Sequence, residues 1–204
     1  VLQAGAGQAP SRQVALGAGL PNYVAATTIN KVCGSSLKAA MIAANSIKAG
    51  EYKAIIAGGM ESMTNAPKFE KRNGDEKEMV STMIHDGLWD VYSDVHMGNT
   101  GEIVANECNI SREKMDSFAA RSQNKAAEAE ANGWFDWGRF DMPELSTDEG
   151  VRAGTTAEKL AGLKPVFQDD GMVTAGNAST LSDGASAILV ADEDFAKANG
   201  WEII

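Results

Sequence analysis

Cysteine and long apolar runs are scarce in this sequence of 204 residues. Its two cysteines, Cys33 and Cys108, are too few for a disulfide framework or a cysteine metal site. We therefore expect a reducing compartment, the cytoplasm or, in a eukaryote, the mitochondrial matrix. No apolar run approaches the roughly 18 residues of a membrane span, so we expect no membrane partner. With a net charge of −10, the chain is also a poor match for nucleic acid.

An initiator methionine is also absent, and the first residues, VLQAGAGQAPSRQ, lack the basic and apolar regions of a signal peptide. We expect the chain to begin inside a longer coding sequence. The composition, 44% hydrophobic and 23% charged, is typical of a soluble globular protein. A length of 204 residues suffices for one large domain or for a core with an inserted subdomain.

The first third of the chain alternates between strand and helix patterns. Residues 23–32 are rich in β-branched side chains and carry a single charge, at Lys31, which predicts a buried strand. Residues 35–49 predict a helix, and a second apolar strand follows at 52–59. The helix carries its apolar residues at spacings of four and three, namely Leu37, Met41, Ala44 and Ile47. A strand, a helix and a strand in this order predict a βαβ unit with parallel strands, and hence an α/β sheet.

The middle of the chain has a different character. Residues 68–78 are highly charged and are interpreted as a solvated loop. Two helices are predicted between residues 96 and 133, the second capped by Ser111. Residues 185–191 return to a strand pattern, and a short helix follows. We therefore predict a sheet domain at 1–62 and 182–204, interrupted by a mainly helical insertion at 63–181.

Cys33 lies where the first predicted strand meets the helix, directly before Gly34, Ser35 and Ser36. A helix start carries unpaired N–H groups and a partial positive charge, which favour an ionised thiolate and can hold a developing oxyanion. Gly34 would let a substrate approach the sulfur. On position alone, however, a lone cysteine more often serves packing. For Cys108, inside a helical pattern without a glycine turn, packing is the favoured interpretation.

Four blocks of sequence decide between these interpretations of Cys33. They are INKVCGSSLKA, AGGMESMTNAP, HMGNTGE and GMVTAGNASTLSDGASA, in this order along the chain. Together they resemble the thiolase family, of the acetyl-CoA acetyltransferase type. GGMESM and TAGNAS favour a thiolase over a ketoacyl synthase.

The resemblance implies a thiolase-like α/β fold, with part of the N-terminal α/β domain and its inserted, mainly helical loop domain. It also implies coenzyme A and acetyl-CoA as substrates rather than as a permanently bound cofactor, and no metal. Cys33 would accept an acyl group from one acyl-CoA, and a second acetyl-CoA would attack that acyl-enzyme to give acetoacetyl-CoA; the reverse reaction is thiolytic cleavage. Members of the family commonly form homodimers or homotetramers.

The same resemblance implies roles for five more residues. His96 and Met97 fall where the family lines its substrate pocket. Leu88 and Ser179 fall where residues contact the pantetheine arm of coenzyme A, and Arg152 where a basic residue meets its adenine nucleotide. Glu61 and Asn177, which follow glycine-containing turns, are interpreted as hydrogen-bonding residues that hold those turns and are left out of catalysis.

Departures from the family pattern leave a second hypothesis open. Thiolases also use a histidine in a Gly-His-Pro context and a cysteine in a Cys-x-Gly-Gly context, both in a C-terminal domain. Here neither His85 nor His96 precedes a proline, and Cys108 lies in NECNIS. We expect a fragment that lacks the first strands and the C-terminal domain. The alternative to an enzyme is therefore a truncated, catalytically incomplete module that binds coenzyme A or serves assembly.

Overall fold

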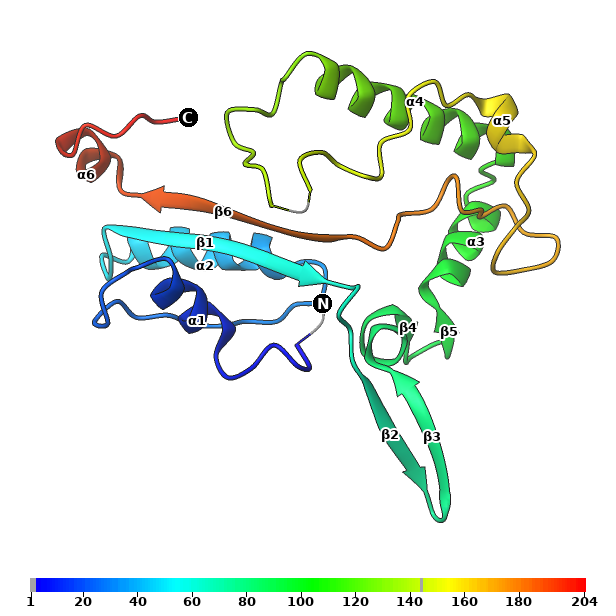
Figure 1. Ribbon diagram of the computed structural model, residues 1–204, viewed down its shortest axis with the longest axis horizontal. Coiled ribbons are helices and arrows are strands. Elements are labelled where there is room, and N and C mark those ends of the chain that lie inside the picture. Colours follow the sequence, from blue (N-terminus) through cyan, green and yellow to red (C-terminus); the bar gives the residue numbers. More distant parts are fainter. Residues whose placement is uncertain (1–2, 144) are drawn as a thin grey trace. The chain divides into compact units, whose positions relative to one another are not determined.

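The computed structural model describes residues 3–143 and 145–204. These residues divide into two compact units (Figure 1). The first unit comprises the chain up to Trp89 together with Leu181–Ile204, and the second comprises Asp90–Thr180. Residues 63–89, which the sequence assigned to the inserted domain, group with the first unit. The family-domain boundaries at 62/63 and 181/182 stay a prediction.

The first unit is built on one pair of strands, β1 (Ala54–Ser62) and β6 (Asp183–Ala191). The strands run antiparallel, with Ala54 opposite Ala191 and Ser62 opposite Asp183. Helix α2 (Ser35–Lys48) packs against this pair, as Figure 1 shows. Helices α1 (Pro10–Gly17) and α6 (Glu193–Ala198) also belong to this unit. The predicted helix at 35–49 and the strands at 52–59 and 185–191 are thereby confirmed.

The predicted buried strand at residues 23–32 is wrong for the described chain. The segment is largely exposed and belongs to no ladder of strands. Its backbone instead accepts hydrogen bonds from α1, where the Arg12 guanidinium donates to the carbonyls of Asn22 and Val24. A strand needs a second strand for its N–H and C=O groups, and the described residues supply none here. The parallel βαβ unit is therefore not formed, and β1 pairs with the antiparallel β6.

Helix α2 does not bury the apolar face that the spacing predicted. Leu37 and Met41 are 70% and 51% exposed, whereas Ala43 is 2% exposed. The helix approaches β1 through small residues. A Cβ added to Gly59 would lie only 2.2 Å from the hydroxyl oxygen of Ser36. A glycine at 59 therefore permits close packing of helix on strand. Small residues make the contact, and the larger apolar residues point elsewhere.

The charged segment at 68–78 was interpreted as a loop, and this is also corrected. It forms a hairpin of β2 (Lys68–Asn73) and β3 (Glu76–Ser81), in antiparallel register. The turn passes through Gly74, whose φ of +64° lies in the left-handed region that favours glycine. Gly74-Asp75, the two residues between the paired Asn73 and Glu76, is a Gly-Asp hairpin signal that the charge pattern obscured. A π-helix, η1 (Met83–Leu88), and the short strands β4 (Trp89–Asp90) and β5 (Val95–His96) follow.

The second unit is helical, with α3 (Met97–Glu107), α4 (Arg112–Ala131) and the short α5 (Ala157–Ala161). The hydroxyl of Ser111 accepts the N–H of Lys114, which confirms the predicted cap of α4. The three largest fully buried side chains of the described chain, Glu102, Thr174 and Asp116, all lie in this unit and all are polar. None of the described helices is long and apolar enough to cross a membrane.

Candidate functional site

Cys33 is exposed and lies directly before Gly34, the N-cap residue of α2. The helix and the turn expected around this cysteine are present, whereas the described residues form no strand before it. Backbone hydrogen bonds close the turn: Gly34 N–H donates to the Lys31 carbonyl at 3.0 Å, and Ser35 N–H to the Val32 carbonyl at 3.2 Å. A thiol at this place is open to solvent and lies at the positive end of a 14-residue helix.

Cys108 is exposed as well, at the C-cap of α3. The interpretation of Cys108 as a packing residue is therefore wrong. It lies at the C-terminal, negative end of its helix, whereas Cys33 precedes the N-terminal, positive end of α2. The two cysteines thus form a natural pair for comparing reactivity, since exposure alone does not separate them.

Leu88, the residue expected to contact the pantetheine arm, is the last residue of η1 and is half-buried. The same helix carries His85, whose ring packs edge-on against Phe69 of β2 with centroids 5.3 Å apart. Leu88 and Cys33 both belong to the first unit.

His96 caps α3. Its Nδ1 accepts the N–H of Gly98 at 3.0 Å, so the neutral ring carries its proton on Nε2. The ring stacks on Phe167 with centroids 5.0 Å apart. A Cβ on Gly98 would meet the Phe167 ring at 2.2 Å, so this position requires a glycine for the stack to form. Met97, the first residue of α3, is partly exposed beside it.

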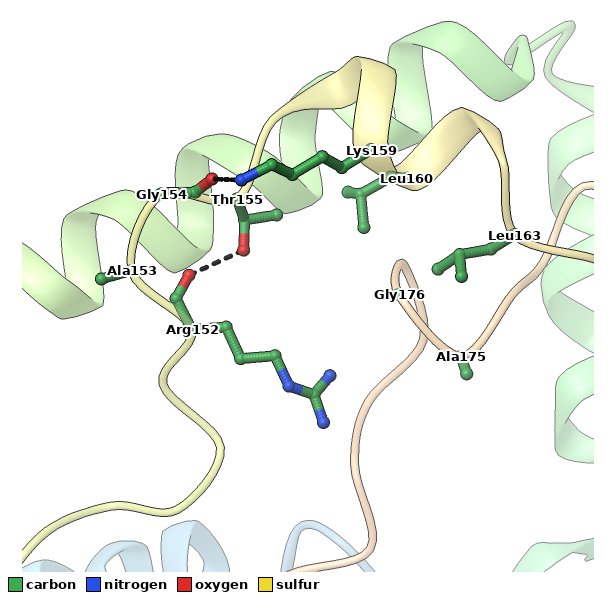
Figure 2. Close-up of a pocket in the computed structure, with 9 residues that line it drawn as sticks. All are labelled: Arg152, Ala153, Gly154, Thr155, Lys159, Leu160, Leu163, Ala175 and Gly176. Carbon is green, nitrogen blue, oxygen red and sulfur yellow. Dashed lines mark hydrogen bonds between the residues drawn. The ribbon is translucent and has the colours of Figure 1, made fainter.

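A pocket of about 310 Å³ lies in the second unit, between the segment that carries Arg152 and the loop at Ala175–Gly176 (Figure 2). Two cationic side chains, Arg152 and Lys159, line it together with small and apolar residues. The amino group of Lys159 donates to the Gly154 carbonyl at 2.8 Å, and the Thr155 hydroxyl donates to the Arg152 carbonyl at 2.7 Å. These contacts fix the backbone that presents the Arg152 guanidinium.

Lys159 was missed from the sequence. It follows Arg152 by seven residues on α5, a helix too short to show a periodic pattern. The available signal was Thr156, whose hydroxyl accepts the N–H of Lys159 and caps α5. Once that cap is recognised, Lys159 falls in the first turn of α5, shortly after Arg152.

The carboxylates near the helix starts remain ionised at neutral pH. The Ser111 hydroxyl holds the pKa of Glu113 below its usual value, and the backbone N–H of Glu158 itself, with the Thr156 hydroxyl, does the same for Glu158. These negative charges offset the positive helix starts of α4 and α5. Attraction of an anion to the pocket therefore depends on the side chains of Arg152 and Lys159.

Arg112, on α4, fixes the apolar wall of this pocket. Its guanidinium donates to the carbonyls of Leu160 and Leu163 at 2.7 and 3.0 Å and forms an ion pair with the buried Asp116 at 2.7 Å. Opposite, Gly176 lies so close that an added Cβ would meet the Leu163 and Leu160 side chains at 2.5 and 2.6 Å. The pocket's shape thus depends on an ion pair and on a glycine.

Asn177 holds the loop that precedes Ser179, as expected. Its amide nitrogen donates to Asp116 and to the Met172 carbonyl, each at 3.0 Å, and its oxygen accepts the Thr174 N–H at 2.8 Å. Glu61 lies in β1 opposite Gly184. Ser179 itself is exposed and does not line the pocket of Arg152.

The expected site residues are distributed over both units. His96, Met97, Arg152 and Ser179 lie in the second unit, and within it His96 and Met97 adjoin at the start of α3. The loop at 171–177 is bound to both α3, which His96 and Met97 begin, and α4. Glu102 of α3 accepts backbone N–H groups of the loop, and Asp116 of α4 accepts the side-chain amide of Asn177.

Comparison with known proteins identifies the family. The family described as "Thiolase, N-terminal domain" matches residues 1–194. The chain belongs to the thiolase family. It is 50% identical to an acetyl-CoA acetyltransferase of Cupriavidus necator, over 98% of this chain and 54% of that protein. An acetyl-CoA acetyltransferase of Pseudomonas aeruginosa is 47% identical, over 100% of this chain and 56% of that protein.

A solved thiolase structure agrees with this assignment. The crystal structure of Acat5 thiolase from Ascaris suum in complex with coenzyme A matches with a TM-score of 0.91 and 33% identity, over 98% of this chain and 54% of that one. The predicted thiolase-like α/β fold is thus confirmed. This thiolase chain spans about half the length of the curated relatives it matches.

Proposed function

We propose that this thiolase chain takes part in acyl transfer between coenzyme A thioesters, with Cys33 as the nucleophile. The observation that carries the proposal is an exposed cysteine directly before a 14-residue helix in a member of the thiolase family. The substrates we propose are acetyl-CoA and 3-ketoacyl-CoA. The acetyl-CoA acetyltransferase names of the relatives support this choice.

In the proposed reaction, the Cys33 thiolate attacks the carbonyl carbon of acetyl-CoA. A bond forms between that carbon and Sγ, the bond to the sulfur of coenzyme A breaks, and coenzyme A leaves as a thiolate. A second acetyl-CoA gives up a methyl proton to a base, and its carbanion attacks the acetyl group on Cys33. The new carbon–carbon bond yields acetoacetyl-CoA and regenerates the thiolate. Thiolysis is the same sequence reversed.

The start of α2 is suited to both halves of this chemistry. Its positive end favours the thiolate that attacks and the thiolate that is released. Backbone N–H groups near a helix start can also hold the oxygen that becomes negative in the tetrahedral intermediate. Acylation of Cys33 exchanges one thioester for another, so no large energy input is needed to load the cysteine.

The pocket of Arg152 and Lys159 is the proposed site for the anionic, adenine-nucleotide end of coenzyme A. Its two cationic side chains would attract phosphate groups. Its wall of small and apolar residues, which includes Leu160, suits a base or ribose. Leu88 and Ser179 are proposed to contact the pantetheine arm. His96 and Met97 are proposed to line the acyl pocket.

Binding experiments test the nucleotide site. Arg152→Ala should weaken coenzyme A binding by about three- to tenfold, since a charge-assisted hydrogen bond is worth about 1.5 kcal/mol or less at an exposed position. Pantetheine, which lacks the nucleotide, should bind equally to both forms. Arg121→Ala, which removes an exposed arginine of α4, is the matched control. An equal loss of affinity for coenzyme A and for pantetheine would contradict the assignment of Arg152.

Acylation tests the nucleophile. Incubation with acetyl-CoA should add one acetyl group to Cys33, detected by mass spectrometry, and Cys108→Ala should leave this label unchanged while Cys33→Ala abolishes it. Labelling of Cys108 alone would refute the assignment.

A second candidate function is a module that binds coenzyme A or serves assembly without catalysing condensation. It concerns the 204 residues taken by themselves, because this chain spans about half the length of the curated relatives it matches. Such a module would bind coenzyme A yet form no acetoacetyl-CoA. We further propose a homodimeric or homotetrameric assembly in the cytoplasm, or in the mitochondrial matrix of a eukaryote.

A further inference from the structure

Val32, the residue before the proposed nucleophile, has a left-handed backbone. Its φ is +48°, in the region that L side chains rarely adopt. For a β-branched valine this conformation is a true outlier, and such outliers persist only where the surroundings hold them. Because Val32 is bonded directly to Cys33, its torsions determine where the Cys33 backbone and thiol lie relative to α2.

Two side chains, together with the Ser35 backbone N–H, hold Val32 in this conformation. Asn30 accepts the Val32 N–H through Oδ1 at 2.7 Å, and the Ser35 hydroxyl donates to the Val32 carbonyl at 2.7 Å. Both backbone polar groups of the strained residue are therefore bound by side chains within three residues of it. The same Ser35 oxygen accepts the Lys31 N–H at 2.9 Å, which fixes the hydroxyl from a second direction.

Ser35 is placed unusually for a serine at a helix start. The N-cap residue of α2 is Gly34, which provides no side-chain cap, and Ser35 is the first helical residue. Its hydroxyl bonds backward to the turn that carries Val32 and Cys33, not forward into the helix. Its neighbour Ser36 instead packs over Gly59 of β1. The two adjacent serines thus act on different parts of the unit.

We propose that Asn30 and Ser35 are positioning residues for the Cys33 thiol. They hold Val32 in the left-handed conformation, and Val32 in turn sets the thiol at the start of α2. The inference rests on the proposed function, in which Cys33 is the nucleophile. Without these contacts, Val32 would relax toward a negative φ, and the thiol would move away from the N–H groups at the start of α2.

Alkylation by iodoacetamide on the full chain tests this inference, with Cys33 and Cys108 followed separately by mass spectrometry across a pH series. In the unmodified protein, Cys33 should react faster near neutral pH. Asn30→Ala and Ser35→Ala should each slow Cys33 by about three- to tenfold, the factor for loss of one hydrogen bond, and leave Cys108 unchanged. Ser36→Ala and Asn45→Ala are the controls on α2 and should retain the original rate at Cys33.

A closely matched pair of substitutions distinguishes the loss of the hydroxyl from a general effect on folding. Ser35→Thr keeps the hydroxyl and should retain the fast reaction, whereas Ser35→Val replaces that hydroxyl with a methyl group and should be slow. A role in folding alone would change the thermal unfolding temperature without changing the ratio of the two cysteine rates. Equal Cys33 rates for Ser35→Thr and Ser35→Val would overturn the positioning role. A Cys33 no faster than Cys108 in the unmodified protein would overturn the nucleophile assignment and this inference together.

Discussion

Glu102 is a buried carboxylate held by backbone amides. It is 1% exposed, and its two oxygens accept the N–H of Met172 at 2.8 and 2.9 Å and that of Val173 at 2.8 Å. A Cβ on Gly171 would lie 2.3 Å from one of these oxygens, so the turn can approach the carboxylate only with a glycine there. One side chain of α3 therefore fixes the loop that leads to Asn177 and Ser179.

Replacing Glu102 with glutamine should loosen this loop. Glutamine keeps one oxygen that can accept both amides, but it puts an N–H₂ group where the second oxygen now accepts the Met172 N–H at 2.8 Å, so two buried donors face each other. We expect a loss of about 1–3 kcal/mol in local stability. Hydrogen exchange of the Met172 and Val173 amides should become faster by about tenfold or more, since 1.4 kcal/mol corresponds to a factor of ten.

The control for Glu102→Gln is Glu107→Gln, an exposed position at the end of the same helix. It removes the same charge from α3 and should leave exchange at Met172 and Val173 unchanged. Protection of those amides at the original level in Glu102→Gln would show that the loop does not depend on the carboxylate.

At the scale of single residues, the sequence predicted the roles of residues whose hydrogen-bond partners lie nearby in the chain. The cap Ser111 and the turn-holding Asn177 were recognised because their partners lie within a few residues. Lys159 and Glu102 were not, because their importance comes from a pocket and from a loop 70 residues away. Cys33 was placed correctly at a helix start, but the left-handed Val32 beside it has no signal in residue type.

Among elements, the strand pair of β1 and β6 is fastened at one end by Asp183. Its carboxylate accepts the Thr64 N–H at 3.0 Å and the Ser62 hydroxyl at 3.2 Å, so it ties β6 to the end of β1. The Thr64 backbone N–H, with a smaller contribution from Ser62, holds the pKa of Asp183 below its usual value. The ionised form is therefore the one that the folded strand pair prefers.

This preference gives the strand pair a pH dependence. Because the folded pKa is the lower one, Asp183 stabilises the pair above its unfolded pKa of about 3.9, and this contribution is lost as the pH falls through the folded value. We expect exchange of the Thr64 amide, corrected for its intrinsic pH dependence, to accelerate as the pH falls below about 4. Asp183→Asn should show fast exchange already at pH 6 and little further change. An identical pH profile in both proteins would contradict the prediction.

Helices were predicted better than strands, and the reason is physical. A helix satisfies its backbone internally, so caps and apolar spacing locate it, as for α2 and α4. A strand depends on a partner, so the β-branched run at 23–32 is no strand where the described residues supply no partner. The charged run at 68–78 forms a hairpin, because its Gly74-Asp75 turn brings a second strand back alongside the first.

For the molecule as a whole, the first unit leaves much of its apolar surface uncovered. Ile56 of β1 and Leu189 of β6 face each other across the strand pair, and they are 59% and 54% exposed. Leu37 on α2 is also exposed. Open strand edges and uncovered apolar side chains favour association with another chain.

We therefore expect the 204-residue chain alone to be marginally stable and to self-associate. At micromolar concentration, sedimentation should show species heavier than the 21.5 kDa monomer, and a dye that binds apolar surface should fluoresce in its presence. Leu37→Lys and Leu189→Lys should each reduce the heavier species, because a charge on an uncovered apolar surface opposes its burial in a contact, at little cost to an already exposed position. Lys48→Gln, at the exposed end of α2, changes a charge outside this surface and should leave association unaltered. A monodisperse monomer with a single cooperative thermal transition would contradict this expectation, since it would mean that the exposed apolar residues of α2, β1 and β6 require no partner.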